Sequence, residues 1–275
     1  VVDGLRRDPD SPPFLSCYLS GPNLAFRARG LSDVKAGLLH HSGGKGADDQ
    51  EARVSALSEA VERYCGSRHG DELAVRDTQA ALGKAALHPN EVMLFHDHQY
   101  RDRDRWNAEG HAGAAVPRPF DERVPAEWTP VRSLLDGRER LLPTQLLYYH
   151  RPEQVTGTVF AWADSNGNAA GSTLDDAIVR GFLELVERDG VALWWYNRTR
   201  RPAVRLDELG DAWATELVEH FHAMNREIWV LDLTTDLGVP VMAAVSRRTG
   251  EGPQDIMLGF GAHFDARTAV RRALA

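Results

Sequence analysis

The sequence of this 275-residue chain predicts an α+β fold, with hairpin-type antiparallel strands and helices packed on one side of them. Two stretches of β-type residues, 226–234 and 239–247, are separated only by a short turn, which is typical of a hairpin. Two amphipathic helices are expected over residues 49–64 and 173–197, well apart from these strands. The chain has no low-complexity tract and no linker-like segment. We therefore expect a single domain over residues 1–275.

The individual elements follow from local pattern. Bulky or alternating residues predict strands at 14–20, 156–163, 226–234, 239–247 and 256–263, and a strand followed by a turn at 141–150. Helical periodicity and capping residues, including Thr173 as an N-cap, predict helices at 49–64, 78–86, 173–197 and from 266 onward. Two other segments lack such patterns: HSGGKGADDQ (41–50) is expected to be a glycine-rich loop, and 94–128 a long surface excursion.

Composition limits the class of protein. With 43% hydrophobic and 26% charged residues the chain reads as a globular protein. No apolar run reaches the ~18–20 residues of a membrane helix, and the N-terminal residues lack the apolar stretch of a secretory signal. A net charge of −8 argues against nucleic-acid binding. Two cysteines, Cys17 and Cys65, favour a reducing cytoplasm over a disulfide. Both ends look abrupt, so we expect an excerpt truncated at both ends.

The pentad Glu-x-x-Glu-Arg occurs twice, each time on a predicted helix. The first copy contains Glu59 and Glu62, and the second contains Glu184 and Glu187. At 100° per residue, Ser55 falls within the same sector of roughly 60° as the first two glutamates. The opposite faces are expected to be buried, with Ala56, Leu57, Ala60, Val61 and Tyr64 on one helix and Ile178, Val179, Phe182, Leu183, Leu185 and Val186 on the other.

Two interpretations of the pentads are open. Each could be a solvated helix face, stabilised by ~0.2–0.5 kcal/mol per Glu–Arg pair one turn apart. Alternatively, the facing carboxylates could hold two Mg²⁺ ions that clamp a triphosphate, because Mg²⁺ prefers hard oxygen ligands and phosphates. Each pentad follows a glycine-rich segment, SGGKG with Lys45 or SNGNAAG, where backbone and lysine could approach phosphate. SGGKG lacks Walker A spacing. The repeated order favours a nucleotide site.

The same segments resemble known sequences. SGGKG with SALSEAVERYCG resembles the first ATP-site motif of the YcaO family, and DSNGNAAGSTLDDAIVRGFLELVERDGVALWWYNRTRRPAV resembles the second. The stretch ELVERDGVALWWYNR is most similar to the azoline-forming cyclodehydratases of thiazole/oxazole-modified peptide (microcin, bacteriocin) biosynthesis. The resemblance implies a YcaO-like α+β fold with mixed or antiparallel sheets and helices around a central ATP site.

The resemblance also implies roles for particular residues. The metal-binding glutamates of the family match Glu59, Glu62, Glu184 and Glu187. The predicted ATP-binding residues are Ser55, Lys45, Ser172, Asp176 and Arg188. In the family a GNTLEEA-like run is usual, and here GSTLDDA places Ser172 and the shorter Asp176 there. Arg271 or Arg272 could reach phosphate. A further glutamate and a proline-rich tail would follow Ala275 in the family. No residue is singled out as catalytic.

The implied function is ATP- and Mg²⁺-dependent cyclodehydration. Cys, Ser or Thr of a ribosomally made precursor peptide attacks the preceding carbonyl, and ATP phosphorylates the resulting oxyanion before ring formation. Expected partners are the precursor and a separate or fused leader-recognition protein of the ubiquitin-activating-enzyme-like or ocin-ThiF-like type, and a homodimer is possible. Thioamide or amidine formation, a non-catalytic scaffold that binds precursor peptide, and an ordinary ATP-dependent ligase are the alternatives.

Overall fold

The computed structural model describes residues 5–7, 12, 14–21, 42–109, 115–149 and 157–275. The chain divides into two compact units. Unit 1 comprises residues 1–64 and 166–275, and unit 2 comprises residues 65–165. That all of residues 1–275 form one domain stays a prediction.

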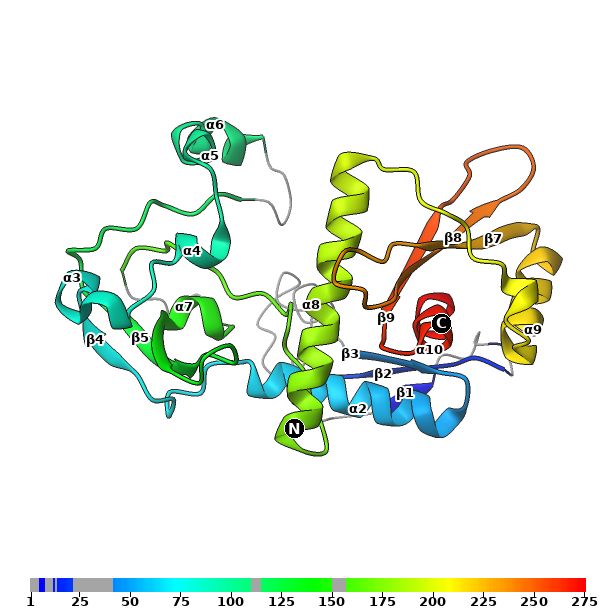
Figure 1. Ribbon diagram of the computed structural model, residues 1–275, viewed down its shortest axis with the longest axis horizontal. Helices are drawn as coiled ribbons and strands as arrows, with labels where there is room; N and C mark the ends of the chain where they lie inside the picture. The colour runs from blue at the N-terminus through cyan, green and yellow to red at the C-terminus, as the bar shows by residue number, and fades with distance from the viewer. Residues whose placement is uncertain (1–4, 8–11, 13, 22–41, 110–114, 150–156) are drawn as a thin grey trace, which may run out of the picture. The chain divides into compact units, whose positions relative to one another are not determined.

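Unit 1 contains two three-stranded antiparallel sheets (Figure 1). The first, in the order β1-β2-β3, consists of Leu5–Arg7, Ser16–Ser20 and Ser42–Gly46. The second, in the order β7-β8-β9, consists of Arg226–Asp232, Val241–Arg248 and Met257–Ala262. The four strands predicted in these regions are confirmed, because their alternating or apolar patterns match the buried positions of the sheets.

The glycine-rich segment 42–46 is strand β3 and not the predicted loop. It pairs with β2 along its whole length, and helix α2 (Asp49–Cys65) follows it. Glycine inside a strand often marks a place where another backbone approaches closely. A Cβ on Gly44 would lie 2.1 Å from the amide nitrogen of Ala56 and 2.2 Å from the carbonyl oxygen of Ala52. The glycine here therefore lets α2 pack directly on the sheet.

This close packing also narrows the buried stripe of α2. The buried residues are Ala52, Ala56 and Ala60. Leu57, Val61 and Tyr64, which were expected to be buried, are 38%, 47% and 45% exposed. Only methyl-sized side chains fit between a helix and a sheet at this separation, so the larger apolar side chains lie outside the contact. The predicted bounds of the helix are confirmed.

Helix α8 (Leu174–Asn197) agrees with the predicted helix, and the Thr173 side chain caps it as expected. Its buried residues are Gly181, Leu183, Val186 and Gly190. Three residues that were expected to be buried are more than 40% exposed: Val179, Phe182 and Leu185. The loop before the helix folds back onto it, since a Cβ on Gly181 would lie 2.4 Å from the carbonyl oxygen of Gly167.

The second sheet has helices on both faces, whereas the sequence predicted helices on one side. Met242 and Ala244 of β8 pack with α9 (Ala212–Ala223) and α10 (Ala266–Leu274). Val241 and Ala243 point the other way and pack with α8. A strand buried on both faces reads as a continuous apolar run, which does not reveal how many helices cover it. Helix α9 was not predicted, nor was the short 3₁₀ helix η4 (Leu206–Glu208).

Unit 2 contains a third antiparallel sheet, in the order β4-β5-β6, formed by Val75–Asp77, Ala126–Arg132 and Glu139–Pro143. Around it lie one 3₁₀ helix, η2 (Gly83–Ala85), and short α-helices: α3 (Gln79–Leu82), α4 (Asn90–Met93), α5 (Asp97–Arg101), α6 (Arg103–Ala108) and α7 (Thr144–Leu147). The predicted helix near 78–86 is confirmed. Of the strand and turn predicted over 141–150, the strand is found only at the start, because α7 occupies 144–147, and residue 150 lies outside the described residues.

Two predictions in unit 2 were wrong. Within 94–128, expected to lack regular structure, lie α5, α6 and the start of β5, because helices of about one turn are too short to show a period. The predicted strand at 156–163 is absent from its described residues, 157–163. There the backbone of Thr158 and Phe160 is hydrogen-bonded by the side chain of Gln145 rather than by a neighbouring strand.

Two further expectations concern the whole chain. The thiols of Cys17 and Cys65 are free, as expected. Among the helices that the structure describes, none is long and apolar enough to cross a bilayer.

Candidate functional site

The first glutamates of the two pentads, both in unit 1, have matching environments. The carboxylate of Glu59 accepts hydrogen bonds from the backbone N–H of Gly43 at 3.2 Å and from the arginine of its own pentad at 3.2 Å. The carboxylate of Glu184 accepts from the backbone N–H of Gly167 at 3.2 Å and from its own pentad arginine at 3.3 Å. The two pentads are therefore structural equivalents as well as sequence repeats.

The second glutamates of the pentads, Glu62 and Glu187, show that both helices contribute to one acidic region. Burial raises the pKa of Glu62 to about 7; Arg63 opposes this rise, and the charges of Glu184 and Glu59 add to it. Burial also raises the pKa of Glu187, against the opposing charge of the adjacent Arg188. Because Glu62 of α2 responds to Glu184 of α8, the carboxylates of both pentads lie within electrostatic reach of one another.

Two cations border this acidic region. Lys45 Nζ donates a hydrogen bond to the carbonyl oxygen of Arg272 at 3.2 Å. Although Lys45 keeps contact with solvent, neighbouring atoms displace water around its ammonium and lower its pKa, and the charge of Glu187 opposes the shift. Burial likewise lowers the pKa of the Arg272 guanidinium, with Arg180 adding to the shift and Glu187 opposing it. Glu187 therefore interacts with both cations.

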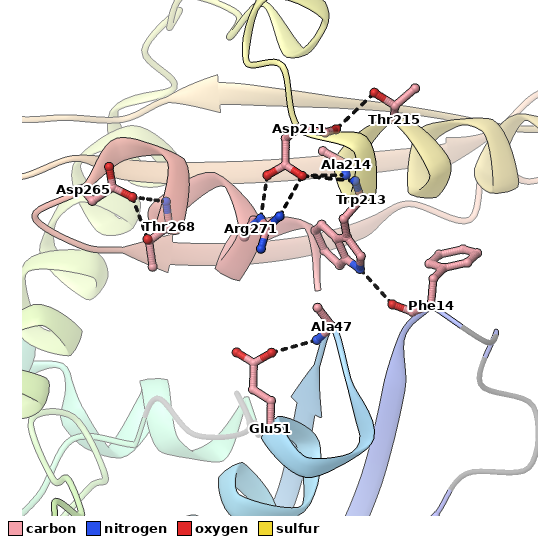
Figure 2. A network of polar contacts seen from close by, with 10 residues as sticks. All are labelled: Phe14, Ala47, Glu51, Asp211, Trp213, Ala214, Thr215, Asp265, Thr268 and Arg271. Atoms are coloured by element: carbon pink, nitrogen blue, oxygen red, sulfur yellow. Dashed lines mark hydrogen bonds and ion pairs between the residues drawn. The ribbon is translucent and has the colours of Figure 1, made fainter.

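Of the two arginines of helix α10, Arg272 interacts with Glu187 of this region, whereas Arg271 pairs with Asp211. Arg271 donates two hydrogen bonds to the carboxylate of Asp211 (Figure 2), whose side chain is only 2% exposed. The same carboxylate caps α9 by accepting from the backbone N–H groups of Trp213 and Ala214. Since Asp211 occupies Arg271, its neighbour Arg272 is the arginine that interacts with Glu187. That one of the two arginines reaches phosphate stays a prediction, and the pairing of Arg271 with Asp211 favours Arg272.

The remaining predicted nucleotide contacts lie along α2 and at the start of α8. The carboxylate of Asp176 accepts from the backbone N–H of Ser172 at 3.0 Å and from Arg180 Nε at 2.9 Å, and Arg180 is the larger cause of its lowered pKa. The Ser172 hydroxyl lies 3.4 Å from the same carboxylate. Ser55 is half-buried on α2, and no hydrogen bond within the described residues ties it to the glutamates.

The carboxylates suit a divalent cation that is completed by phosphate. In the described part of the chain, no three or more His, Cys, Asp or Glu side chains form a ready-made metal cage. Mg²⁺ does not require one, because it is usually held by one or two carboxylates with water and phosphate as further ligands. The mutual repulsion that helps to raise the pKa of Glu62 is relieved by a bound cation. The assignment of the four glutamates as metal ligands stays a prediction.

Sequence reasoning missed the backbone amides that hold the first glutamates. A usable signal was present, since Glu59 follows Gly43 by 16 residues and Glu184 follows Gly167 by 17. It was hidden because one glycine lies in a strand and the other in a loop, so the two segments do not look alike locally.

The chain is similar in sequence and in fold to known proteins. A family model described as YcaO cyclodehydratase, ATP- and Mg²⁺-binding, matches residues 43–275. A solved structure described as a heterocyclase in complex with substrate and cofactor has a TM-score of 0.90 and 45% identity, over 99% of this chain and 36% of that one. The structure of the heterocyclase TruD has a TM-score of 0.74 and 46% identity, over 81% of this chain and 32% of that one.

An uncharacterized protein of Methanothermobacter thermautotrophicus is 31% identical over 235 residues, which is 84% of this chain and 54% of that protein. The chain spans about half the length of the curated relatives it matches, and about a third of the two heterocyclase chains.

Proposed function

The chain belongs to the YcaO family, and on this premise we propose that it forms the ATP- and Mg²⁺-binding part of a peptide cyclodehydratase. The observation that carries the proposal is the electrostatic repulsion of Glu62 by Glu184, which places the two pentads in one acidic region. Lys45 and Arg272 border that region with the positive charge that phosphate needs. The identity to the two heterocyclase structures supports this class over other YcaO chemistries.

The proposed division of labour follows from charge. Negatively charged carboxylates hold divalent cations, and cationic side chains hold phosphate. We assign the cations to Glu59, Glu62, Glu184 and Glu187. We assign the nucleotide to Lys45, Ser55, Ser172, Asp176, Arg188 and Arg272. When bound, Mg²⁺–ATP supplies the phosphoryl group that turns an amide oxygen into a leaving group.

Hydrogen bonds within the chain hold the proposed metal-binding glutamates in place before a cation or nucleotide binds. The glycine N–H groups and pentad arginines orient one carboxylate on each helix, which leaves the second glutamate of each pair as the more adaptable one. The guanidinium of Arg188 lies 3.3 Å from a carboxylate oxygen of Glu184 and 3.7 Å from one of Glu187. It can therefore turn from either carboxylate to a phosphate without leaving the region.

The proposed reaction removes one water from the precursor peptide for each ring. The thiol of Cys or the hydroxyl of Ser or Thr loses its proton and attacks the carbonyl carbon of the preceding residue. The resulting oxyanion takes the terminal phosphoryl group of ATP. The carbon–oxygen bond then breaks, phosphate leaves, and loss of the amide proton gives the thiazoline or oxazoline. ADP and phosphate are the other products.

The proposal also covers partners and location. The substrate is a ribosomally made precursor peptide, and a separate or fused leader-recognition protein presents it. The two free thiols support a reducing cytoplasm as the compartment.

The test compares Glu184→Gln and Glu59→Gln with the control Glu216→Gln, an exposed glutamate on α9. Binding of ATP to the chain is measured by calorimetry with and without Mg²⁺. Modification of a Cys/Ser/Thr-containing precursor is followed by mass spectrometry with the leader-recognition protein present. We expect Mg²⁺-dependent binding in the control and loss of binding and of dehydration in the site variants. Equal ATP binding by all three variants would refute the metal assignment.

A further inference from the structure

Unit 2 contains a cavity of about 730 Å³ that the proposed reaction does not use. Its walls come from residues between 68 and 160, and no residue assigned to ATP or Mg²⁺ belongs to them. The volume lies within the ~300–1,000 Å³ typical of ligand sites, well above what a single inorganic ion needs.

Four arginines line this cavity, and two of them are already engaged. Arg68 donates to Glu127 at 2.7 Å, and Arg103 donates to Asp104 at 2.5 Å. Arg103 also donates to the carbonyl oxygen of Pro117 at 3.1 Å. These two arginines are therefore neutralised, and they hold the wall in shape.

The other two arginines, Arg76 and Arg118, leave positive charge in the cavity. Within the residues that the structure describes, no hydrogen bond or ion pair occupies either guanidinium, and both residues are exposed. The remaining acidic residue of the lining, Asp121, is bonded to the backbone N–H of Arg123. A planar guanidinium forms two parallel hydrogen bonds with a carboxylate, so a pair of such groups favours a ligand with carboxylates.

One part of the wall is formed by packed aromatic side chains. Phe120 packs against Phe160 with ring centroids 4.7 Å apart and against the buried Trp128 at 5.9 Å. The backbone N–H of Arg118 donates to the carbonyl oxygen of Val159 at 3.3 Å, which joins the two segments that carry these rings. The cavity therefore combines a preformed aromatic wall with two guanidinium groups that have no partner among the described residues.

We propose that this cavity binds an acidic segment of the precursor peptide, with Arg76 and Arg118 pairing with Asp or Glu side chains and the Phe120–Phe160 wall covering the adjacent residues. The proposal rests on the proposed function in one respect, namely that the substrate is a peptide. It assigns to unit 2 a docking role separate from the acidic region of unit 1.

The experiment measures binding of a short fluorescein-labelled peptide of alternating Glu and Ser by anisotropy, using the full chain without ATP or Mg²⁺. The same peptide with Gln in place of Glu is the neutral ligand. We compare Arg76→Gln/Arg118→Gln with Arg123→Gln/Arg138→Gln, which removes the same charge outside the cavity lining. We expect the first double variant to lose affinity for the Glu peptide about tenfold or more, and the second to bind like the unmodified chain.

Three results would overturn the proposal: equal affinity for the Glu and Gln peptides, equal loss in both double variants, or displacement of the peptide by inorganic phosphate or free glutamate at the peptide's own concentration. The last result would identify a simple anion site. Arg76→Glu/Arg118→Glu should in turn prefer a Lys/Ser peptide. Because Glu184→Gln should bind the Glu peptide normally, failure of the docking role and failure of the proposed ATP chemistry are distinguishable.

Discussion

Replacement of Glu62 by Gln should stabilise the ligand-free protein at high pH. Burial and the neighbouring carboxylates raise the pKa of Glu62 from 4.5 to about 7. The folded protein therefore binds more protons than the unfolded chain between these values. The favourable contribution of protonated Glu62 is fully present below pH 4.5 and is lost as the pH rises through 7.

The magnitude follows from the two pKa values. Proton linkage gives a cost of about 3 kcal/mol at pH 8, where Glu62 is ionised in the folded protein, and of about 1 kcal/mol at pH 5, where folding keeps Glu62 protonated. Solvent screening of a side chain that is only partly buried reduces the expected difference between the two pH values to about 1–2 kcal/mol. Glu62→Gln removes this cost, because the neutral amide does not ionise.

The assay is urea denaturation of the unmodified chain and the variant at pH 5 and pH 8, without Mg²⁺ or nucleotide. The variant should gain more stability over the unmodified chain at pH 8 than at pH 5. Glu216→Gln on α9 serves as a control and should show no such pH dependence. An equal difference at both pH values would mean that neither burial nor the neighbouring carboxylates raise the pKa of Glu62, and the reasoning that places it in an acidic region would fail.

Three further predictions test other parts of the structure. Gly44→Ala should destabilise the protein by about 3 kcal/mol or unfold it in a thermal scan, whereas Gly43→Ala, whose new Cβ meets nothing closer than 4.0 Å, should be nearly neutral. Asp211→Ala should lower the free energy of unfolding in urea by about 2 kcal/mol or more, because it removes a helix cap and the partner of Arg271. Asp265→Ala removes an exposed cap and serves as the control, and an equal or larger loss in that variant would contradict the prediction. Lys45→Met should weaken Mg²⁺–ATP binding about tenfold in calorimetry, and unchanged affinity would exclude a phosphate contact.

The sequence determined the helices that carry the acidic side chains. Glu59 and Glu62 are one turn apart, as are Glu184 and Glu187, and helical geometry alone places each pair on one face. The cap at Thr173 and most strands of unit 1 also followed from local pattern, because propensity and periodicity act over neighbouring residues.

Tertiary structure decided the rest. The segment SGGKG is a strand because Gly44 allows α2 to pack on the sheet. This packing depends on residues 52 and 56, so the composition of the segment alone does not reveal it. The pairing of Arg271 depends on Asp211, which lies 60 residues away in the sequence. The approach of Glu62 to Glu184 likewise depends on how two distant helices pack. Local sequence could therefore name the acidic groups of this YcaO protein, and only packing between distant segments could bring them together.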